Sequence, residues 1–201
     1  MVAILPIKPV KITDDPSHQP TPFKYVFPIL TGSYDEALRL FIYDSTTAKN
    51  RLVTEAQLGG GVWRLKLMDE YVESIPREES NGAGCAAMEP RETNHFLVLA
   101  SCMHAGVKIL RITYTAQYCS LPKDTLGYEE LVANMGWQIE VVAQFTAGHE
   151  SMVYCCDFRT EEAELGPGSY TIVSTSFYDK QVCVWGFVDE VKRALGSKER
   201  T

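Results

Sequence analysis

The segments TGSYDEALRLF (31–41), ASCMHAGVKIL (100–110) and TSFYDKQVCVW (175–185) are three copies of one pattern. Each copy starts with small residues, continues through a short polar turn and ends in an alternating apolar run that closes on a bulky side chain. Alternation with a period of two on both sides of a polar turn predicts a β-hairpin. The copies lie 69 and 75 residues apart, and a hairpin repeated along a chain predicts an architecture of repeated antiparallel sheets.

The repeat also fixes two positions in each copy. Aligned on their turns, the copies share a polar position (Asp35, His104, Asp179) and, six residues later, a bulky position (Phe41, Leu110, Trp185). The dipeptide Gly148-His149 precedes the third copy, as Gly-His precedes the turn Asp and the Trp in one WD40 blade. The spacing exceeds the ~40–45 residues of a plain blade, which indicates inserted loops. The sequence therefore predicts an all-β fold, a WD40 β-propeller.

Strand-like segments and turn signals divide the chain. We expect a Pro-rich N-terminal segment, three blades of a partial propeller and a charged C-terminal tail: 1–25, 26–187 (blades at about 26–57, 59–145 and 149–187) and 188–201. The first blade has only its three outer strands in this assignment, and the last lacks its outermost strand. Closed propellers have at least about four blades. The expectation is a C-terminal portion of a larger propeller, or a truncated gene model.

Composition excludes several classes of protein. The formal net charge of −7 and the pI near 5.1 argue against a surface that tracks nucleic-acid phosphates. No apolar run approaches the ~18–20 residues of a membrane span, so neither nucleic acid nor membrane is expected as a partner. Six cysteines occur without a CxxC pair, which indicates a reduced, cytoplasmic protein with no structural metal.

Five strings carry a resemblance to one family. TGSYDE (31–36), GGGVWRLK (59–66), CMHAGVKIL (102–110), HESMVYCCDF (149–158) and STSFYD (174–179) resemble, in order and spacing, the WD40 diphthine methylesterases of diphthamide biosynthesis. The chain departs from the family where a strand that commonly ends in Trp ends in Phe158. The resemblance implies hydrolysis, without a cofactor or metal, of the methyl ester of methylated diphthine on translation elongation factor two, giving diphthine and methanol.

The predicted topology places candidate substrate-binding residues at one end of the blades. Antiparallel strands bring alternate turns to the same end. The substrate implied by the resemblance carries a trimethylammonium group, which aromatic faces and carboxylates bind. The candidates at that end are Tyr34, Asp35, Glu36, Trp63, Tyr154, Phe177 and Tyr178.

Four residues are candidates for the chemistry. His104 is the candidate general base, because it stands where the other copies have Asp. Ser151 is a possible nucleophile. His149 and Asp179 are also candidates, although a structural pair that ties two turns together explains them better. The chain has no G-x-S-x-G elbow, which excludes an α/β-hydrolase mechanism. The alternative function is a non-catalytic WD40 interaction scaffold, since fold alone does not determine activity.

Overall fold

The computed structural model describes residues 3–7, 10–12, 24–44, 48–75, 91–115 and 136–198, and three antiparallel sheets account for most of them. The first sheet has the strand order β1-β3-β4-β5, with β2 also paired to β3. Its strands are β1 (Ala3–Pro6), β2 (Val10–Ile12), β3 (Lys24–Gly32), β4 (Ala37–Asp44) and β5 (Lys49–Gln57).

The other two sheets follow in chain order. The second sheet has the order β6-β7-β8-β9: β6 (Arg64–Ile75), β7 (Arg91–Ser101), β8 (Val107–Thr115) and β9 (Gly136–Phe145). The third has the order β10-β11-β12: β10 (Val153–Thr160), β11 (Ser169–Ser176) and β12 (Val182–Val188). A short helix, α2 (Glu162–Leu165), links β10 to β11, and α3 (Glu190–Lys198) follows β12.

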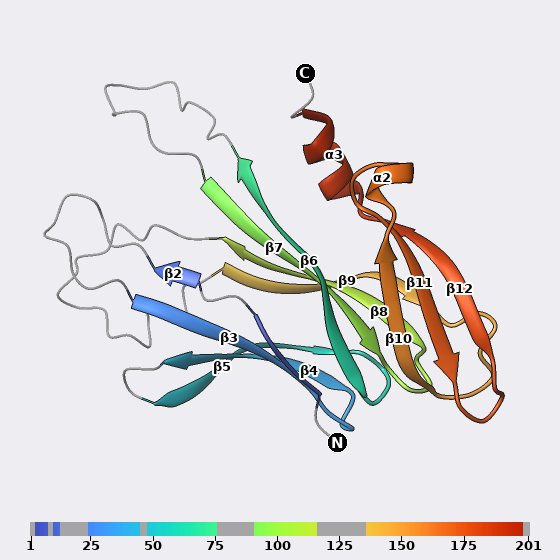
Figure 1. The fold of residues 1–201 in the computed structure, drawn as a ribbon. Helices are drawn as coiled ribbons and strands as arrows, with labels where there is room; N and C mark the ends of the chain where they lie inside the picture. Colours follow the sequence, from blue (N-terminus) through green and yellow to red (C-terminus); the bar gives the residue numbers. More distant parts are fainter. Residues whose placement is uncertain are drawn as a thin grey trace, which may run out of the picture.

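The sheets are arranged side by side like the ribs of a fan, in the order of the sequence (Figure 1). One buried apolar cluster fills the space between the first and second sheets, and includes Leu38, Leu40, Val98 and Leu110. A second cluster lies between the second and third sheets and includes Ile109 and Tyr170. Because each middle strand alternates its side chains between two faces, the second sheet contributes to both clusters.

The three repeated segments are hairpins, as predicted. They form β3–β4, β7–β8 and β11–β12. The first two have the same register, with Gly32 opposite Leu38 and Ser101 opposite Val107. The third turn is one residue longer. Ser176 donates its backbone N–H to the carbonyl of Gln181 at 3.1 Å, five residues on, whereas in the second turn Cys102 donates to the carbonyl of Gly106 at 2.7 Å, four residues on. Equivalent positions therefore differ by 69 between the first two hairpins, and by 74 (β11) or 75 (β12) between the second and third.

Several predicted boundaries need correction. The first sheet takes in β1 and β2 from residues 1–25, which we expected to lie outside the blades. A strand ending in Pro6 is tolerated there because β1 is short and lies at the end of the sheet. The strands β6 and β7 extend into residues 69–94, a polar stretch whose turn residues (Pro76, Gly82, Gly84 and Pro90) predict an exposed insertion. The C-terminal tail contains α3. The sequence of 113–136 predicts one helical turn around 129–133, and that turn lies outside the described residues.

Candidate functional site

Three hairpin turns lie at one end of the three sheets, toward the lower edge of Figure 1. Backbone hydrogen bonds connect this end across sheet boundaries. Val62 N–H donates to the carbonyl of Ser33 at 2.9 Å, which joins the first sheet to the segment that leads into the second. Val153 N–H donates to the carbonyl of Met103 at 3.0 Å. These bonds hold the turn of each sheet against the start of the next sheet, so the turns form one continuous surface.

Gly59-Gly60-Gly61 crosses from the first sheet to the second at this end. A Cβ on Gly60 would lie 2.1 Å from the carbonyl oxygen of Cys102, so any larger residue would displace the β7–β8 turn. A Cβ on Gly61 would lie 2.6 Å from Sδ of Met103 and 3.5 Å from Tyr34. The glycines therefore allow the crossover to pack between two turns, which brings Trp63 beside Tyr34.

Five aromatic rings form a continuous row across all three sheets, which we call the aromatic row: Tyr34, Trp63, Tyr154, Phe177 and Tyr178. Successive ring centroids lie 5.8, 4.9, 6.4 and 5.2 Å apart, and the rings meet edge to face. Edge-to-face contact is a favourable arrangement for aromatic rings. The two ends of the row are open, because Tyr34, Phe177 and Tyr178 are 54%, 70% and 67% exposed. The structure thus brings the predicted aromatic residues together.

The middle of the row is more enclosed than its ends. Tyr154 and Trp63 are half-buried. Loss of solvent, followed by the neighbouring Tyr178 and Tyr34, raises the pKa of the Tyr154 phenol. Its hydroxyl donates to Sδ of Met152 at 3.4 Å. Tyr154 is therefore a neutral phenol at physiological pH, and it presents its ring in the middle of the row without a charge.

His104 and Glu36 face each other from two adjacent sheets beside this row. Nε2 of His104 lies 3.9 Å from Oε1 of Glu36, and the two side chains are 62% and 44% exposed. Glu36 occupies the left-handed region, with φ of 67°, next to Tyr34 in the same turn. The imidazole is thus accessible to a ligand and has a carboxylate partner, an arrangement that suits proton transfer.

The turn that carries His104 is built differently from the other two. In the first and third turns, an Asp carboxylate accepts the backbone N–H two residues later: Asp35 from Ala37 and Asp179 from Gln181, each at 3.3 Å. These are Asx turns. In the second turn, Gly106 donates its N–H to the carbonyl of Met103 at 3.1 Å instead. The imidazole of His104 is therefore not needed to close its turn.

Two of the other three predicted catalytic residues, His149 and Asp179, belong to a closed hydrogen-bond network. Nδ1 of His149 bonds Ser176 Oγ and Nε2 bonds Ser174 Oγ, each at 2.8 Å. Ser176 Oγ donates in turn to Asp179, whose other carboxylate oxygen accepts the backbone N–H of Glu150 at 2.7 Å. Both ring nitrogens of His149 are engaged, which leaves neither for activating Ser151. This network ties the turn before β10 to the β11–β12 turn.

The Asp179 network predicts acid sensitivity. The hydroxyl of Ser176, followed by backbone N–H groups, holds the pKa of Asp179 below its usual range. A lowered folded-state pKa stabilises the fold above the unfolded-state value, and this stabilisation is lost as the pH falls through the folded-state pKa. We expect Asp179→Ala to lower the Tm by about 2–4 °C at pH 7, and by less below pH ~3.8. Calorimetry against pH measures this, with Glu150→Ala as control; equal losses at both pH values would contradict it.

The sequence also predicts a nucleophile at Ser151, substrate binding by Asp35 and no structural metal. Ser151 is half-buried at the entry to β10 and, among the described residues, no hydrogen bond to its hydroxyl is found. Asp35 is engaged by Arg39 at 2.7 Å, so its carboxylate is already paired. Within the described part of the chain, no group of three or more His, Cys, Asp or Glu side chains could hold a metal ion. No helix among the described residues is long and apolar enough to cross a membrane.

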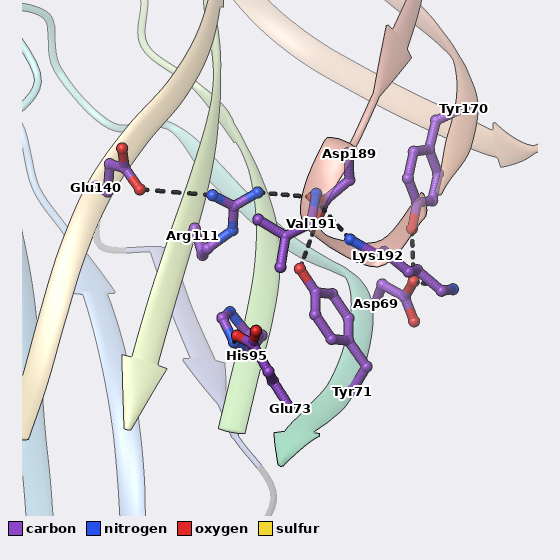
Figure 2. Close-up of polar contacts among 10 residues, drawn as sticks. All are labelled: Asp69, Tyr71, Glu73, His95, Arg111, Glu140, Tyr170, Asp189, Val191 and Lys192. Atoms are coloured by element: carbon purple, nitrogen blue, oxygen red, sulfur yellow. Dashed lines mark hydrogen bonds and ion pairs between the residues drawn. The ribbon is translucent and has the colours of Figure 1, made fainter. Parts of the chain in front are cut away.

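A second polar cluster lies at the opposite end of the sheets, where α3 begins (Figure 1), and Figure 2 shows its side chains. Asp189, which is fully buried, accepts hydrogen bonds from Arg111 at 2.7 Å and Tyr71 at 2.9 Å. It also caps α3 by accepting the backbone N–H of Val191 at 3.0 Å. Burial, followed by the neighbouring Asp189, raises the pKa of Tyr71. This cluster fixes α3 to the second sheet.

The same cluster reaches the third sheet and the interior. Lys192 of α3 bonds Asp69, which also accepts the hydroxyl of Tyr170 at 2.5 Å. The ring of His95 stacks on Tyr71 at 4.8 Å, and its Nε2 lies 3.2 Å from Glu73. Burial lowers the pKa of His95. Figure 2 shows these side chains converging between β6, β7 and the start of α3.

Sequence reasoning did not identify this second cluster. One signal was available: Asp189 precedes a short amphipathic segment, as a helix N-cap does. The partners of Asp189 lie 78 and 118 residues earlier, and only the ladder of the second sheet places Arg111 and Tyr71 together. From the sequence alone, a strand residue such as Arg111 is predicted to be an exposed polar side chain.

Comparison with known proteins finds two curated relatives. The chain is 27% identical over 157 residues to a diphthine methyltransferase of Schizosaccharomyces pombe, and equally so to a diphthine methyltransferase homolog of Dictyostelium discoideum. The matches cover 78% of this chain but only 32% and 31% of those proteins, so the chain spans about a third of their length. No family model and no solved structure matches.

Proposed function

We propose that this protein acts in diphthamide biosynthesis by hydrolysing the methyl ester of methylated diphthine on translation elongation factor two. The observation that carries the proposal is the aromatic row beside Glu36 and His104, at one end of the three sheets. The two relatives are named for an enzyme acting on diphthine, which supports the pathway. A substrate carried on a translation factor also implies a cytoplasmic site of action.

We further propose that the fold is a portion of a WD40 β-propeller. Consecutive antiparallel sheets pack face to face, and the second has the four strands of a blade. The network of His149, Ser176 and Asp179 connects the turn before the blade to the hairpin turn within it. Trp185 stacks on Phe145 of the preceding sheet at 4.8 Å. These features agree with the blade pattern in the sequence.

In the proposed complex, the trimethylammonium group of methylated diphthine lies against the half-buried part of the aromatic row. Ring faces attract a quaternary cation, with about 0.5–2 kcal/mol from each well-placed ring. Trp63 and Tyr154 supply neighbouring rings with centroids 4.9 Å apart. The carboxylate of Glu36, in the turn that carries Tyr34, adds a negative charge beside the row. The ester would then lie within reach of the exposed imidazole of His104.

The proposed reaction uses water and no cofactor. His104 accepts a proton from a water molecule as the water oxygen forms a bond to the ester carbonyl carbon. The tetrahedral intermediate collapses by breaking the bond from that carbon to the methoxy oxygen. The departing methoxide takes the proton from the imidazolium and leaves as methanol. The carboxylate of Glu36 stabilises the imidazolium form of His104 between these two proton transfers. Diphthine is released as a carboxylate.

Methanol release tests the proposal directly. We expect the protein to release methanol from elongation factor two that carries methylated diphthine, in proportion to the ester consumed. The matched control is the same factor already converted to diphthine, which has the trimethylammonium but no ester. If the protein is folded by circular dichroism and consumes no ester, the proposed hydrolase activity is refuted.

The names of the two relatives favour a second candidate, methyl transfer to diphthine. Hydrolysis and transfer change the substrate in opposite directions, so one experiment separates them. The protein is incubated with unmethylated acceptor and S-adenosylmethionine carrying a labelled methyl group. Label in the factor would establish transfer. If the protein binds the factor without either reaction, it is the interaction scaffold that propellers commonly are.

A ligand pair tests the aromatic row separately from the chemistry. Choline carries the trimethylammonium group, and its uncharged isostere has a tert-butyl group in that place. Cation–π attraction predicts that choline quenches the fluorescence of Trp63 at a concentration roughly fivefold or more below that of the isostere. Trp63→Phe shows how much of the signal comes from Trp63. Equal affinity for the two ligands would mean that the row is only an apolar surface.

A further inference from the structure

The side chain of Glu36 projects from a fixed backbone beside the aromatic row. The carbonyl of Glu36 accepts the N–H of Leu58 at 2.8 Å, and the next residue, Ala37, donates its N–H to the carboxylate of Asp35 at 3.3 Å. Leu58 and Ala37 are fully buried. The turn therefore holds the Glu36 carboxylate in one region, with its Oε1 3.9 Å from Nε2 of His104.

The negative charge of Glu36 is not neutralised by a permanent cation. The other carboxylate of this turn, Asp35, pairs with Arg39 at 2.7 Å. In the part of the chain that the structure describes, Glu36 has an ion pair only with His104. The imidazole is uncharged whenever it acts as a general base. Glu36 therefore presents a net negative charge to a ligand on the row.

The proposed hydrolysis, on which this inference rests, changes the charge of the ligand at this place. The methyl ester is uncharged, so the substrate carries the single positive charge of its trimethylammonium group. The acid that forms loses its proton to solvent at neutral pH, because carboxyl groups have pKa values of about 4. The product therefore carries a carboxylate as well as the cation.

The new carboxylate forms within the range of the charge on Glu36. A carbonyl group attacked by a water molecule that His104 activates lies a few ångströms from the imidazole. Glu36 lies 3.9 Å from the same ring. Both distances are short compared with the ~8 Å over which physiological salt screens exposed charges. Product binding therefore places two like charges close together.

We propose that Glu36 makes this site selective for trimethylammonium ligands that carry an uncharged acyl group. The attraction between its carboxylate and the quaternary cation acts equally on ester and acid, whereas the repulsion acts only on the acid. For a half-exposed carboxylate, this repulsion weakens binding of the acid by about tenfold. The site therefore binds the substrate in preference to the product, and ionisation of the product favours its release.

Betaine and its carboxamide separate the repulsion from the attraction. Both ligands carry the same trimethylammonium group, and the carboxamide has the shape of the carboxylate without its charge. Neither ligand is an ester, so the measurement does not require hydrolysis. In a titration of the 201-residue chain followed by Trp63 fluorescence, with Trp63→Phe as the blank, we expect the carboxamide to bind about tenfold more tightly than betaine.

Glu36→Gln tests whether this preference comes from the carboxylate, because it removes the charge and keeps the size of the side chain. We expect the ratio of the two dissociation constants to fall from about tenfold to below about threefold. The Tm should stay within about 1 °C, because the side chain is half-exposed. The matched control is Glu150→Gln, which removes the same charge from an exposed side chain before β10 and should leave the ratio unchanged.

Three results would overturn the selectivity. They are equal affinity of the unaltered chain for the two ligands, a tenfold ratio that persists in Glu36→Gln, and binding of neither ligand. Methanol release is measured separately. A chain that releases methanol without discriminating between the ligands is a hydrolase that lacks this selectivity. A chain that discriminates through Glu36 but releases no methanol retains the selectivity, and only the proposed hydrolase activity is refuted.

Discussion

His104→Ala is expected to lower kcat for ester hydrolysis by about 10²–10⁴-fold, the usual contribution of a general base. The Tm should stay within about 1 °C of the unaltered protein, because the side chain is 62% exposed and does not close its own turn. KM should change little, since the aromatic row binds the substrate. Steady-state methanol release over a range of substrate concentrations measures both constants.

Two controls show whether the effect comes from the imidazole. Glu150→Ala alters an exposed side chain in a neighbouring turn and should leave kcat unchanged. The acidic limb of the kcat against pH profile should disappear in His104→Ala, because the group that must be deprotonated is gone. Retention of full kcat would exclude His104 as the base and leave the hydrolase itself untouched.

Asp189→Asn is expected to lower the free energy of unfolding by about 3–5 kcal/mol, the largest effect of any substitution at the α3 end. The substitution keeps the shape of the side chain but removes a fully buried charge that accepts from Arg111 and Tyr71. The guanidinium, only 13% exposed, would lose its buried counter-charge. Urea unfolding followed by circular dichroism measures the change.

A second substitution tests the cause of that loss. Arg111→Met in the Asp189→Asn background removes the buried guanidinium, whose remaining partner, Glu140 at 3.5 Å, is 66% exposed, so the double variant should recover part of the lost stability. Glu190→Ala is the matched control beside it: Glu190 is 76% exposed and pairs with Arg193 only at 3.8 Å. Glu190→Ala should change the free energy of unfolding by no more than about 0.5 kcal/mol. If Asp189→Asn is equally mild, the buried cluster does not hold α3.

The hairpins and the end on which their turns lie could be predicted because both depend on local sequence. Alternation of apolar residues fixes a strand, and antiparallel pairing fixes which turns share an end. The meeting of Tyr34, Trp63 and Tyr154 followed from the same rule, since each residue stands at the turn end of a strand. The one-residue difference in the third turn was not visible, because TSFYDK and TGSYDE align without a gap.

Long-range contacts could not be predicted in this way. The pairing of β1 with β3 joins residues separated by a Pro-rich segment, whose prolines argue against a central strand but do not predict an edge strand. The ion pair of Arg111 with Asp189 depends on where α3 returns to the second sheet. The engagement of both nitrogens of His149 depends on two serines of β11, which in the sequence are ordinary strand residues.

The central claim, ester hydrolysis, is tested most directly by running the reaction in water enriched in heavy oxygen. Attack of water on the carbonyl carbon predicts that the diphthine peptide loses its methyl group and gains one heavy oxygen in its carboxylate. The methanol released should contain only ordinary oxygen. Mass spectrometry of the modified peptide reads both changes at once. A peptide that keeps its methyl ester, or that loses the methyl group without gaining heavy oxygen, would contradict the account.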